Sequence, residues 1–210
     1  MESDRRPRWT IISLPQLARR HGRAVVFGAF ALVSTAVSIL IIGLVADLAG
    51  VPLVFPSLGP TAFLIFDQPR VGAASPRNVL VGHALGLLGG IVALLATGTR
   101  HAPPVFSAAL PANRIAAAAV ALGLTSGAMA VLRMPHPPAA ATALIVSLGF
   151  LGRFTDQLAF YAGVVALVGQ GFVIDRLGGL RYPSWTPTAA ATGDAAGPAR
   201  DGDDGSAPSE

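Results

Sequence analysis

The chain alternates long apolar runs with short polar stretches, and four of the runs are long enough to cross a lipid bilayer. A helix rises about 1.5 Å per residue, so roughly 20 apolar residues span the hydrocarbon of a membrane. Runs of about this length that carry no Asp, Glu, Lys or Arg occupy residues 24–46, 78–98, 115–132 and 157–174. The pattern therefore predicts four long transmembrane helices.

Two further apolar runs, residues 51–66 and 134–151, are broken by proline and glycine. Proline lacks an N–H and disturbs the preceding turn, so the first run is expected to be helical only from about Pro60. The second is expected to be helical from Pro138 to about Leu151. Backbone opened at membrane depth needs partners from protein or from a wet cavity. Each run predicts a short half-helix, and two interpretations stay open: a structural bend, or a helix start that faces a substrate.

The two short runs share a motif. Pro56 and Pro137 are each followed five residues later by a threonine and an alanine, Thr61-Ala62 and Thr142-Ala143. The fold class that follows is an all-α polytopic membrane protein made of two long-short-long repeats. Corresponding Pro/Gly-broken segments in two halves of a membrane protein point to a transport site.

The number of membrane crossings depends on the short runs. If both cross, each repeat has three crossings and the repeats are inverted; if both re-enter, there are four crossings and the repeats are parallel. Cytoplasmic loops carry an excess of arginine and lysine, and the six-crossing arrangement places more of the arginines inside. Both arrangements put the two termini in the cytoplasm, and we expect a bacterial inner membrane.

Composition supports this assignment. Only 12% of the 210 residues are charged and 52% are hydrophobic, whereas soluble domains have about 25% charged residues. The net charge of +4 comes from arginines beside the apolar runs, which indicates topology rather than binding to nucleic acid. We expect a basic cytoplasmic segment at 1–23, a membrane domain at 24–182 and a disordered tail at 183–210.

Polar residues within or beside the apolar runs are the candidates for substrate binding. His83 either faces the bundle interior as a functional group or is a neutral histidine bonded to a backbone carbonyl. Arg77 is either an interfacial anchor or an attractor of anions, and Asn78 would also serve as a helix N-cap. The full candidate set is Ser57, Thr61, Arg77, Asn78, His83, His136, Pro137, Pro138 and Thr142.

Small residues recur at helical spacing in two of the long runs. Gly82, Gly86 and Gly90 form one seam, and Ala119, Gly123 and Gly127 form another. Such seams let helix backbones approach closely. They predict packing either within one chain or between the chains of a homo-oligomer.

Three ordered blocks resemble the HPP family of small integral membrane proteins, named for the triplet His136-Pro137-Pro138. The blocks are Phe55-Pro56-Ser57-Leu58-Gly59-Pro60-Thr61-Ala62, then Pro76-Arg77-Asn78 with Gly82-His83, then His136-Pro137-Pro138-Ala139 with Ala141-Thr142-Ala143. The resemblance covers roughly residues 20–180 and implies four transmembrane helices. Some plant and cyanobacterial members are linked to nitrite transport, so it also implies a role in anion transport. Pro60 and Ala140 depart from the small residue and the glycine common at these places.

Three functional hypotheses follow. In the first, half-helix N-termini, Thr61, Thr142 and two protonatable histidines bind a small inorganic anion, with coupling to protons. In the second, the protein is a structural or signalling membrane component with fixed kinks. The third, an enzyme, is disfavoured, because the chain has no cysteine, no His-x3-His pair and no carboxylate inside a predicted span. We therefore expect no metal and no cofactor; the expected partners are the lipid bilayer and the anion.

Overall fold

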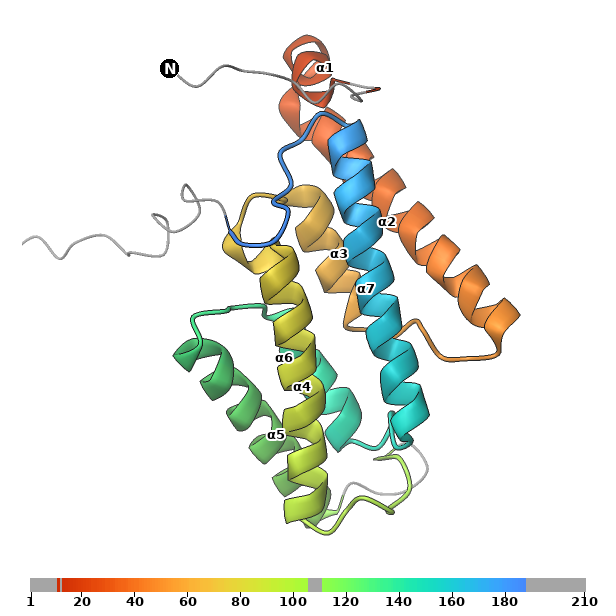
Figure 1. Ribbon diagram of the computed structural model, residues 1–210, viewed down its shortest axis with the longest axis vertical. Helices are drawn as coiled ribbons and strands as arrows, with labels where there is room; N and C mark the ends of the chain where they lie inside the picture. The colour runs from red at the N-terminus through yellow and green to blue at the C-terminus, as the bar shows by residue number, and fades with distance from the viewer. Residues whose placement is uncertain (1–10, 12, 106–110, 188–210) are drawn as a thin grey trace, which may run out of the picture.

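The computed structural model describes residues 11, 13–105 and 111–187. Four long apolar helices dominate it, and the part of the chain that it describes has no strand (Figure 1). The long helices are α2 (Arg23–Ala49), α4 (Pro76–Ala96), α5 (Ala112–Val131) and α7 (Phe154–Leu177). All four are long and apolar enough to cross a membrane. The prediction of an all-helical, multi-pass membrane protein is confirmed.

Two short apolar helices lie among the long ones. They are α3 (Leu58–Asp67) and α6 (Pro138–Ser147). The first begins two residues earlier than predicted, because the first turn of a helix has no internal partner for its N–H groups and so tolerates Pro60. The second ends before the predicted Leu151, because Gly149 takes a left-handed φ of 92° that stops the helix.

The order and direction of the helices repeat. In Figure 1, α2 and α4 both run away from the end where α1 lies, and α3 runs back between them. The second triple runs in the opposite sense: α5 and α7 return toward that end, while α6 runs away from it. Three elements per repeat with reversed direction are the arrangement expected of inverted repeats.

The outer faces of the long helices are covered with exposed aliphatic side chains. Leu32, Leu40 and Leu48 of α2 are 70%, 61% and 87% exposed. Since a water-facing helix would carry polar residues on this side, these faces suit the hydrocarbon of a bilayer. The protein therefore associates with lipid through its long helices.

The glycine seam of α4 packs within the chain. A Cβ added at Gly82 would lie 2.8 Å from His136 Cβ, and one at Gly86 would lie 2.5 Å from the carbonyl oxygen of Ala139. Only glycine lets α6 approach α4 this closely. On α5, by contrast, Gly123 and Gly127 have no neighbour within 4 Å of such a Cβ. The α4 seam is thus an internal contact, and the α5 seam is an open face.

One expectation for a charged residue is wrong. Because the apolar run is predicted to begin at residue 115, Arg114 was expected in the loop before it, but it lies in the first turn of α5 and is 1% exposed. Its guanidinium donates to the carbonyl oxygens of Ser147, Ala102 and Pro103. A buried arginine is tolerated because these acceptors replace its water. Arg114 therefore joins the end of α6 to the 102–103 segment.

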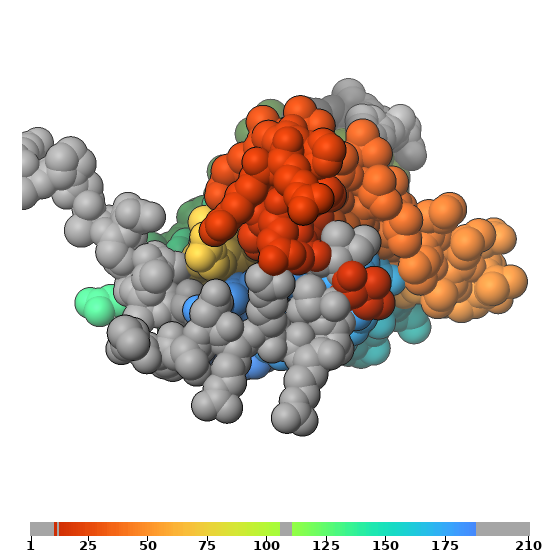
Figure 2. Space-filling view, turned by 90° about the horizontal axis from the view of Figure 1, so that it is seen from above, coloured from red at the N-terminus to blue at the C-terminus, as the bar shows by residue number. Residues whose placement is uncertain are grey.

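The two ends of the described chain meet on one face. Helix α1 (Leu14–His21) packs on α2, and the backbone N–H of Ile11 donates to Leu177 O at 3.0 Å. Seen from above, α1 lies over the start of α2 (Figure 2). Residues 1–10 and 188–210 fall outside the described residues.

Residues 178–187 form a segment that we call the C-terminal strap. The Tyr182 hydroxyl donates to Ala74 O at 2.9 Å, and the Arg77 N–H donates to Trp185 O at 3.1 Å. Pro187 also packs near Gly72. These contacts hold the strap against the short 3-10 helix η1 (Gly72–Ala74) at the start of α4. Residues 183–187, assigned from the sequence to the tail, are thus packed against the membrane domain.

Candidate functional site

Five polar side chains meet at the crossing of the two short helices, and we call them the polar cluster. All five are 0% exposed. They come from the start of α3, from α4, from the turn before α6 and from α6 itself. The members are Ser57, Thr61, His83, His136 and Thr142. Sequence reasoning named all five, and the fold brings them together.

His83 joins the two threonines of the repeated motif. Its Nε2 lies 3.0 Å from Thr61 Oγ1, and its Nδ1 lies 2.7 Å from Thr142 Oγ1. The repeat predicted that the two threonines occupy corresponding positions. In the folded chain a single imidazole from α4 connects them.

His136 completes a triangle of polar atoms. Its Nε2 lies 3.2 Å from Thr61 Oγ1 and 3.2 Å from His83 Nε2. Its Nδ1 lies 2.7 Å from Ala73 O, so this nitrogen donates its hydrogen to η1. The hydrogen bond fixes which nitrogen of His136 carries a hydrogen, as a carbonyl can only accept. The two imidazole rings have centroids 4.9 Å apart.

Ser57 receives the hydroxyl hydrogens of both threonines. Thr61 donates to Ser57 O at 2.8 Å, and Thr142 donates to Ser57 Oγ at 3.0 Å. Ser57 immediately precedes α3, so the start of α3 is bonded directly to the middle of α6. The two half-helices are therefore locked at their crossing by side-chain hydrogen bonds.

Pro137 and Pro138 position the cluster rather than donate to it. Neither has an N–H, and the next two amides are already paired: Ala139 N donates to His136 O at 2.9 Å and Ala140 N to Pro137 O at 3.0 Å. The first turn of α6 thus offers no free amide of the kind the sequence suggested for an anion. The prolines preorganise this turn and so hold His136 in place.

Asn78 and Arg77 lie toward the strap. Asn78 Nδ2 donates to Pro135 O at 3.4 Å, next to His136, and Asn78 Oδ1 is buried without a hydrogen-bond partner. Asn78 is not the N-cap of α4, because the helix begins at Pro76 and Ser75 Oγ accepts from Asn78 N. Arg77 is part-buried beside the strap, and its Nε has no partner.

Asp175 is a buried carboxyl group that directly follows the predicted span 157–174, where the sequence predicts a membrane boundary. Its side chain is 0% exposed, and neither carboxyl oxygen has a hydrogen-bond partner. Its backbone carbonyl accepts from Leu180 N at 2.8 Å, so it sits where the strap leaves α7. Sequence reasoning missed it because a carboxylate at the end of an apolar run is typical of a solvated boundary.

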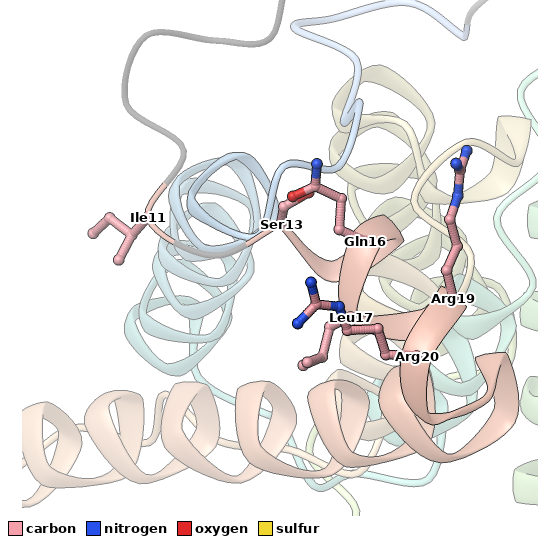
Figure 3. A pocket seen from close by; sticks show the side chains of 6 residues that line it. All are labelled: Ile11, Ser13, Gln16, Leu17, Arg19 and Arg20. Atoms are coloured by element: carbon pink, nitrogen blue, oxygen red, sulfur yellow. The ribbon is translucent and has the colours of Figure 1, made fainter.

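Open space lies away from the polar cluster. A hollow of about 600 Å³ borders α1, lined by Ile11, Ser13, Gln16, Leu17, Arg19 and Arg20 (Figure 3). Figure 3 shows the lining side chains on and beside α1, near the end of α7. The five cluster residues belong instead to the packed interior, in an occluded arrangement.

The cluster offers hydroxyl oxygens and ring nitrogens and no charged side chain. Within the described residues, no group of three or more His, Cys, Asp or Glu side chains is close enough to hold a metal ion. Imidazoles linked to hydroxyls can take up, hold and pass on a proton. Two threonines and a serine can bind a small polar solute once their mutual bonds are exchanged for it.

Comparison with known proteins gives one match. Residues 21–183 match the family model described as HPP, transmembrane region. No curated protein and no solved structure matches the chain. Since the matched region contains all four long helices and the whole polar cluster, the protein belongs to the HPP family of integral membrane proteins.

Proposed function

We propose that this protein is a transporter for a small inorganic anion of the size of nitrite, and not an enzyme. The observation that carries the proposal is the crossing of α3 and α6 at the polar cluster. Two short helices from inverted repeats meet there, each with a proline in its first turn. Thr142 of α6 donates to Ser57 Oγ across the interface, and Thr61 of α3 donates to Ser57 O. Broken helices that meet in the interior of a repeated fold are where transporters bind their substrates.

The chemistry of the crossing favours an anion over a cation. The N-terminal end of a helix carries a partial positive charge, and α3 and α6 both begin at the cluster. Hydroxyl and imidazole N–H groups can donate to an anion, whereas the cluster contains no carboxylate to neutralise a cation. The nitrite link of some members of the family points the same way.

The occluded cluster fits the middle state of an alternating-access cycle. From the crossing, α3 runs toward the end of the molecule where α1 lies, and α6 runs toward the opposite end (Figure 1). Each half-helix therefore borders one half of the path. We propose that separating the two helices from His83 opens the cluster to one side at a time.

The test is anion flux into proteoliposomes that contain the purified protein. Nitrite, nitrate, formate and chloride are offered one at a time, and we expect saturable uptake of at least one. Thr61→Ala removes a cluster hydroxyl and should lower the rate at least about tenfold, the effect of losing roughly 1.4 kcal/mol. Thr97→Ala is the matched control, since the Thr97 hydroxyl bonds to Ala93 O and Thr99 Oγ1 at the far end of α4, away from the polar cluster.

The role of His136 is tested with the same flux assay. His136→Ala should abolish flux, whereas His101→Ala, in an exposed loop, should leave it unchanged. If both histidine variants are folded and transport like the unaltered protein, His136 is not part of the path. If the unaltered protein is folded and carries none of the four anions, transport of this substrate class is rejected.

A structural role is the second candidate, and the density of the hydrogen bonds favours it. Each cluster member is hydrogen-bonded to another member, so the cluster could also serve only to hold the two repeats rigidly together. This function predicts that His136→Ala lowers the melting temperature while no anion is carried by any variant. The flux assay therefore separates the two candidates.

A further inference from the structure

The hydrogen bonds of the polar cluster have defined directions at three of its members. His136 Nδ1 must donate to Ala73 O, because a carbonyl oxygen can only accept. Thr61 has one hydroxyl hydrogen, and it is directed to Ser57 O. Thr142 likewise directs its one hydrogen to Ser57 Oγ.

These directions determine the tautomer of His83. Thr142 Oγ1 has already given its hydrogen to Ser57, so in the 2.7 Å contact with His83 Nδ1 the imidazole must donate. A neutral imidazole has only one N–H. In their neutral forms, His83 and His136 would both carry their hydrogen on Nδ1 and present a lone pair at Nε2.

Three lone pairs then face one another inside the protein. They belong to Thr61 Oγ1, His83 Nε2 and His136 Nε2, whose separations are 3.0, 3.2 and 3.2 Å. With neutral imidazoles and the Thr61 hydrogen on Ser57 O, no hydrogen lies between these atoms. Buried acceptors without a donor are costly, and here the acceptors also repel one another. The triangle is one hydrogen short.

We propose that this triangle is a proton-binding site. One proton from solvent adds to the Nε2 atom of either histidine, and the new N–H donates to the other Nε2 and to Thr61 Oγ1. The proton comes from hydronium, whose O–H bond breaks as the N–H bond forms and whose water returns to the solvent, so no further reactant is needed. The pair then holds three ring hydrogens on four ring nitrogens, as an imidazole and an imidazolium joined by N–H···N.

A buried positive charge at this place needs a counter-ion. Neither ring has a hydrogen bond to a carboxylate or a guanidinium in the described part of the chain, and two helix N-termini oppose a positive charge here. Charged or titratable side chains on the helices that contact the pair are Asp67 on α3, Arg77 on α4, and Asp156, Tyr161, Asp175 and Arg176 on α7. On the basis of the proposed function, we infer that the proton is bound together with the monovalent anion. The proton and the anion then cross the membrane together without net charge.

A metal ion is the competing occupant of a site with two ring nitrogens and a hydroxyl. A divalent ion would bring two charges, and the cluster has neither a carboxylate nor a thiolate to offset them. The proton adds a single charge and completes the hydrogen bonds that are missing. The observations therefore favour the proton.

Nitrogen-15 NMR of labelled histidine tests the site directly. In the His21→Gln/His101→Gln protein, His83 and His136 are the only histidines left, and both replaced residues are exposed. In lipid nanodiscs with nitrite at about pH 6, near the ordinary histidine pKa, we expect three ring N–H signals and a coupling between the two Nε2 atoms. Two N–H signals, or a neutral His83 with its hydrogen on Nε2, would overturn the proposal, as would signals that change on chelation of metals.

Thr142 provides a second variant. Thr142→Val removes the acceptor that keeps the His83 hydrogen on Nδ1, so the hydrogen can move to Nε2 and the pair becomes an ordinary neutral N–H···N contact. We expect the third N–H to disappear in Thr142→Val and to remain in Thr142→Ser. A third N–H that persists in a folded Thr142→Val protein contradicts the assigned directions.

Proteoliposomes with a pH-sensitive dye inside test the coupling. We expect one proton to enter with each anion, and nitrite uptake to rise when the outside is made more acidic. Flux without internal acidification, together with two N–H signals, would refute the proton site and leave anion transport standing. Three N–H signals without flux of any anion would refute the proposed function and leave the proton site standing.

Discussion

At the scale of single residues, the site depends on hydroxyl groups that have no water to replace a lost partner. Thr61 touches Ser57, His83 and His136 with one oxygen atom and is 0% exposed. Tyr182, outside the long helices, is also buried and bonds to Ala74 in η1, the same short segment that His136 reaches. At each of these two sites, a single hydroxyl group determines whether the neighbouring buried polar groups have a hydrogen-bond partner.

Thr61→Val keeps the shape of the side chain and removes its hydroxyl. We expect it to lower the free energy of unfolding by about 1–3 kcal/mol, because Ser57 O loses its hydroxyl donor and the proposed Nε2–H of the histidine pair loses an acceptor in a buried place. Thr61→Ser, which keeps the hydroxyl, should recover most of this loss. Unfolding in mixed micelles measures both, and a Thr61→Val protein as stable as the unaltered one would show that the hydroxyl does not contribute to stability.

Tyr182 should make stability depend on pH in the alkaline range. Burial, aided by the nearby Asp175 carboxyl, raises the pKa of the Tyr182 hydroxyl above its ordinary value. A group whose pKa is raised on folding leaves stability unchanged below its unfolded pKa, about 10 for tyrosine, and lowers stability as the pH rises above it. We expect the melting temperature to fall more steeply above about pH 10 in the unaltered protein than in Tyr182→Phe. Equal slopes would mean that Tyr182 ionises as freely when folded as when unfolded.

At the scale of elements, the approach of α6 to α4 depends on glycine. Gly86 faces Ala139 O and Thr142 Cβ, which would lie 2.5 and 3.1 Å from an added Cβ. The same close approach places Thr142 within reach of His83. The geometry of the polar cluster therefore depends on the close packing of α6 against α4.

Gly86→Ala should push α6 away from α4. We expect a loss of about 1–3 kcal/mol in stability, typical of overpacking, together with loss of flux. Gly127→Ala on α5 is the matched control, since nothing lies within 4 Å of its added Cβ. Thermal unfolding in detergent compares the two variants. A Gly86→Ala protein as stable as the control would mean that α6 can move away from α4 without loss of stability.

At the scale of the whole molecule, the reversed direction of the two triples favours six crossings, with α3 and α6 each carrying the chain back across. The start of α2 and the end of α7 then lie on one side, which we propose is the cytoplasm. The loop that holds Arg70 lies on this same side, whereas in a four-crossing arrangement it would lie on the opposite one. The chain has no cysteine, so single cysteines report position without background.

Labelling with a membrane-impermeant maleimide distinguishes these arrangements. Arg70→Cys, His21→Cys and Arg100→Cys all replace exposed residues. We expect Arg70→Cys to label like His21→Cys and only after the membrane is permeabilised, while Arg100→Cys labels in intact spheroplasts. If Arg70→Cys instead labels like Arg100→Cys, the short helices re-enter and the six-crossing arrangement is wrong.

The sequence by itself determined the helices and the membrane. Apolar length alone predicts α2, α4, α5 and α7, because a bilayer requires a continuous run whose backbone bonds are internal. The repeated Pro-x4-Thr-Ala pattern predicted α3 and α6 as a related pair. It also singled out Thr61 and Thr142, since a polar residue after a proline break in an apolar run is locally conspicuous.

Only the tertiary structure decided which of these groups touch. Nothing local indicates that His83 lies between the two threonines, that His136 reaches Ala73, or that Arg114 is buried among carbonyl groups. Those contacts join residues 22 to 63 positions apart and depend on how α6 packs on the glycines of α4. The hydrogen-bond directions, and with them the missing proton, are a property of the assembled cluster: a hydroxyl becomes a donor or an acceptor only through the partner that the fold places beside it.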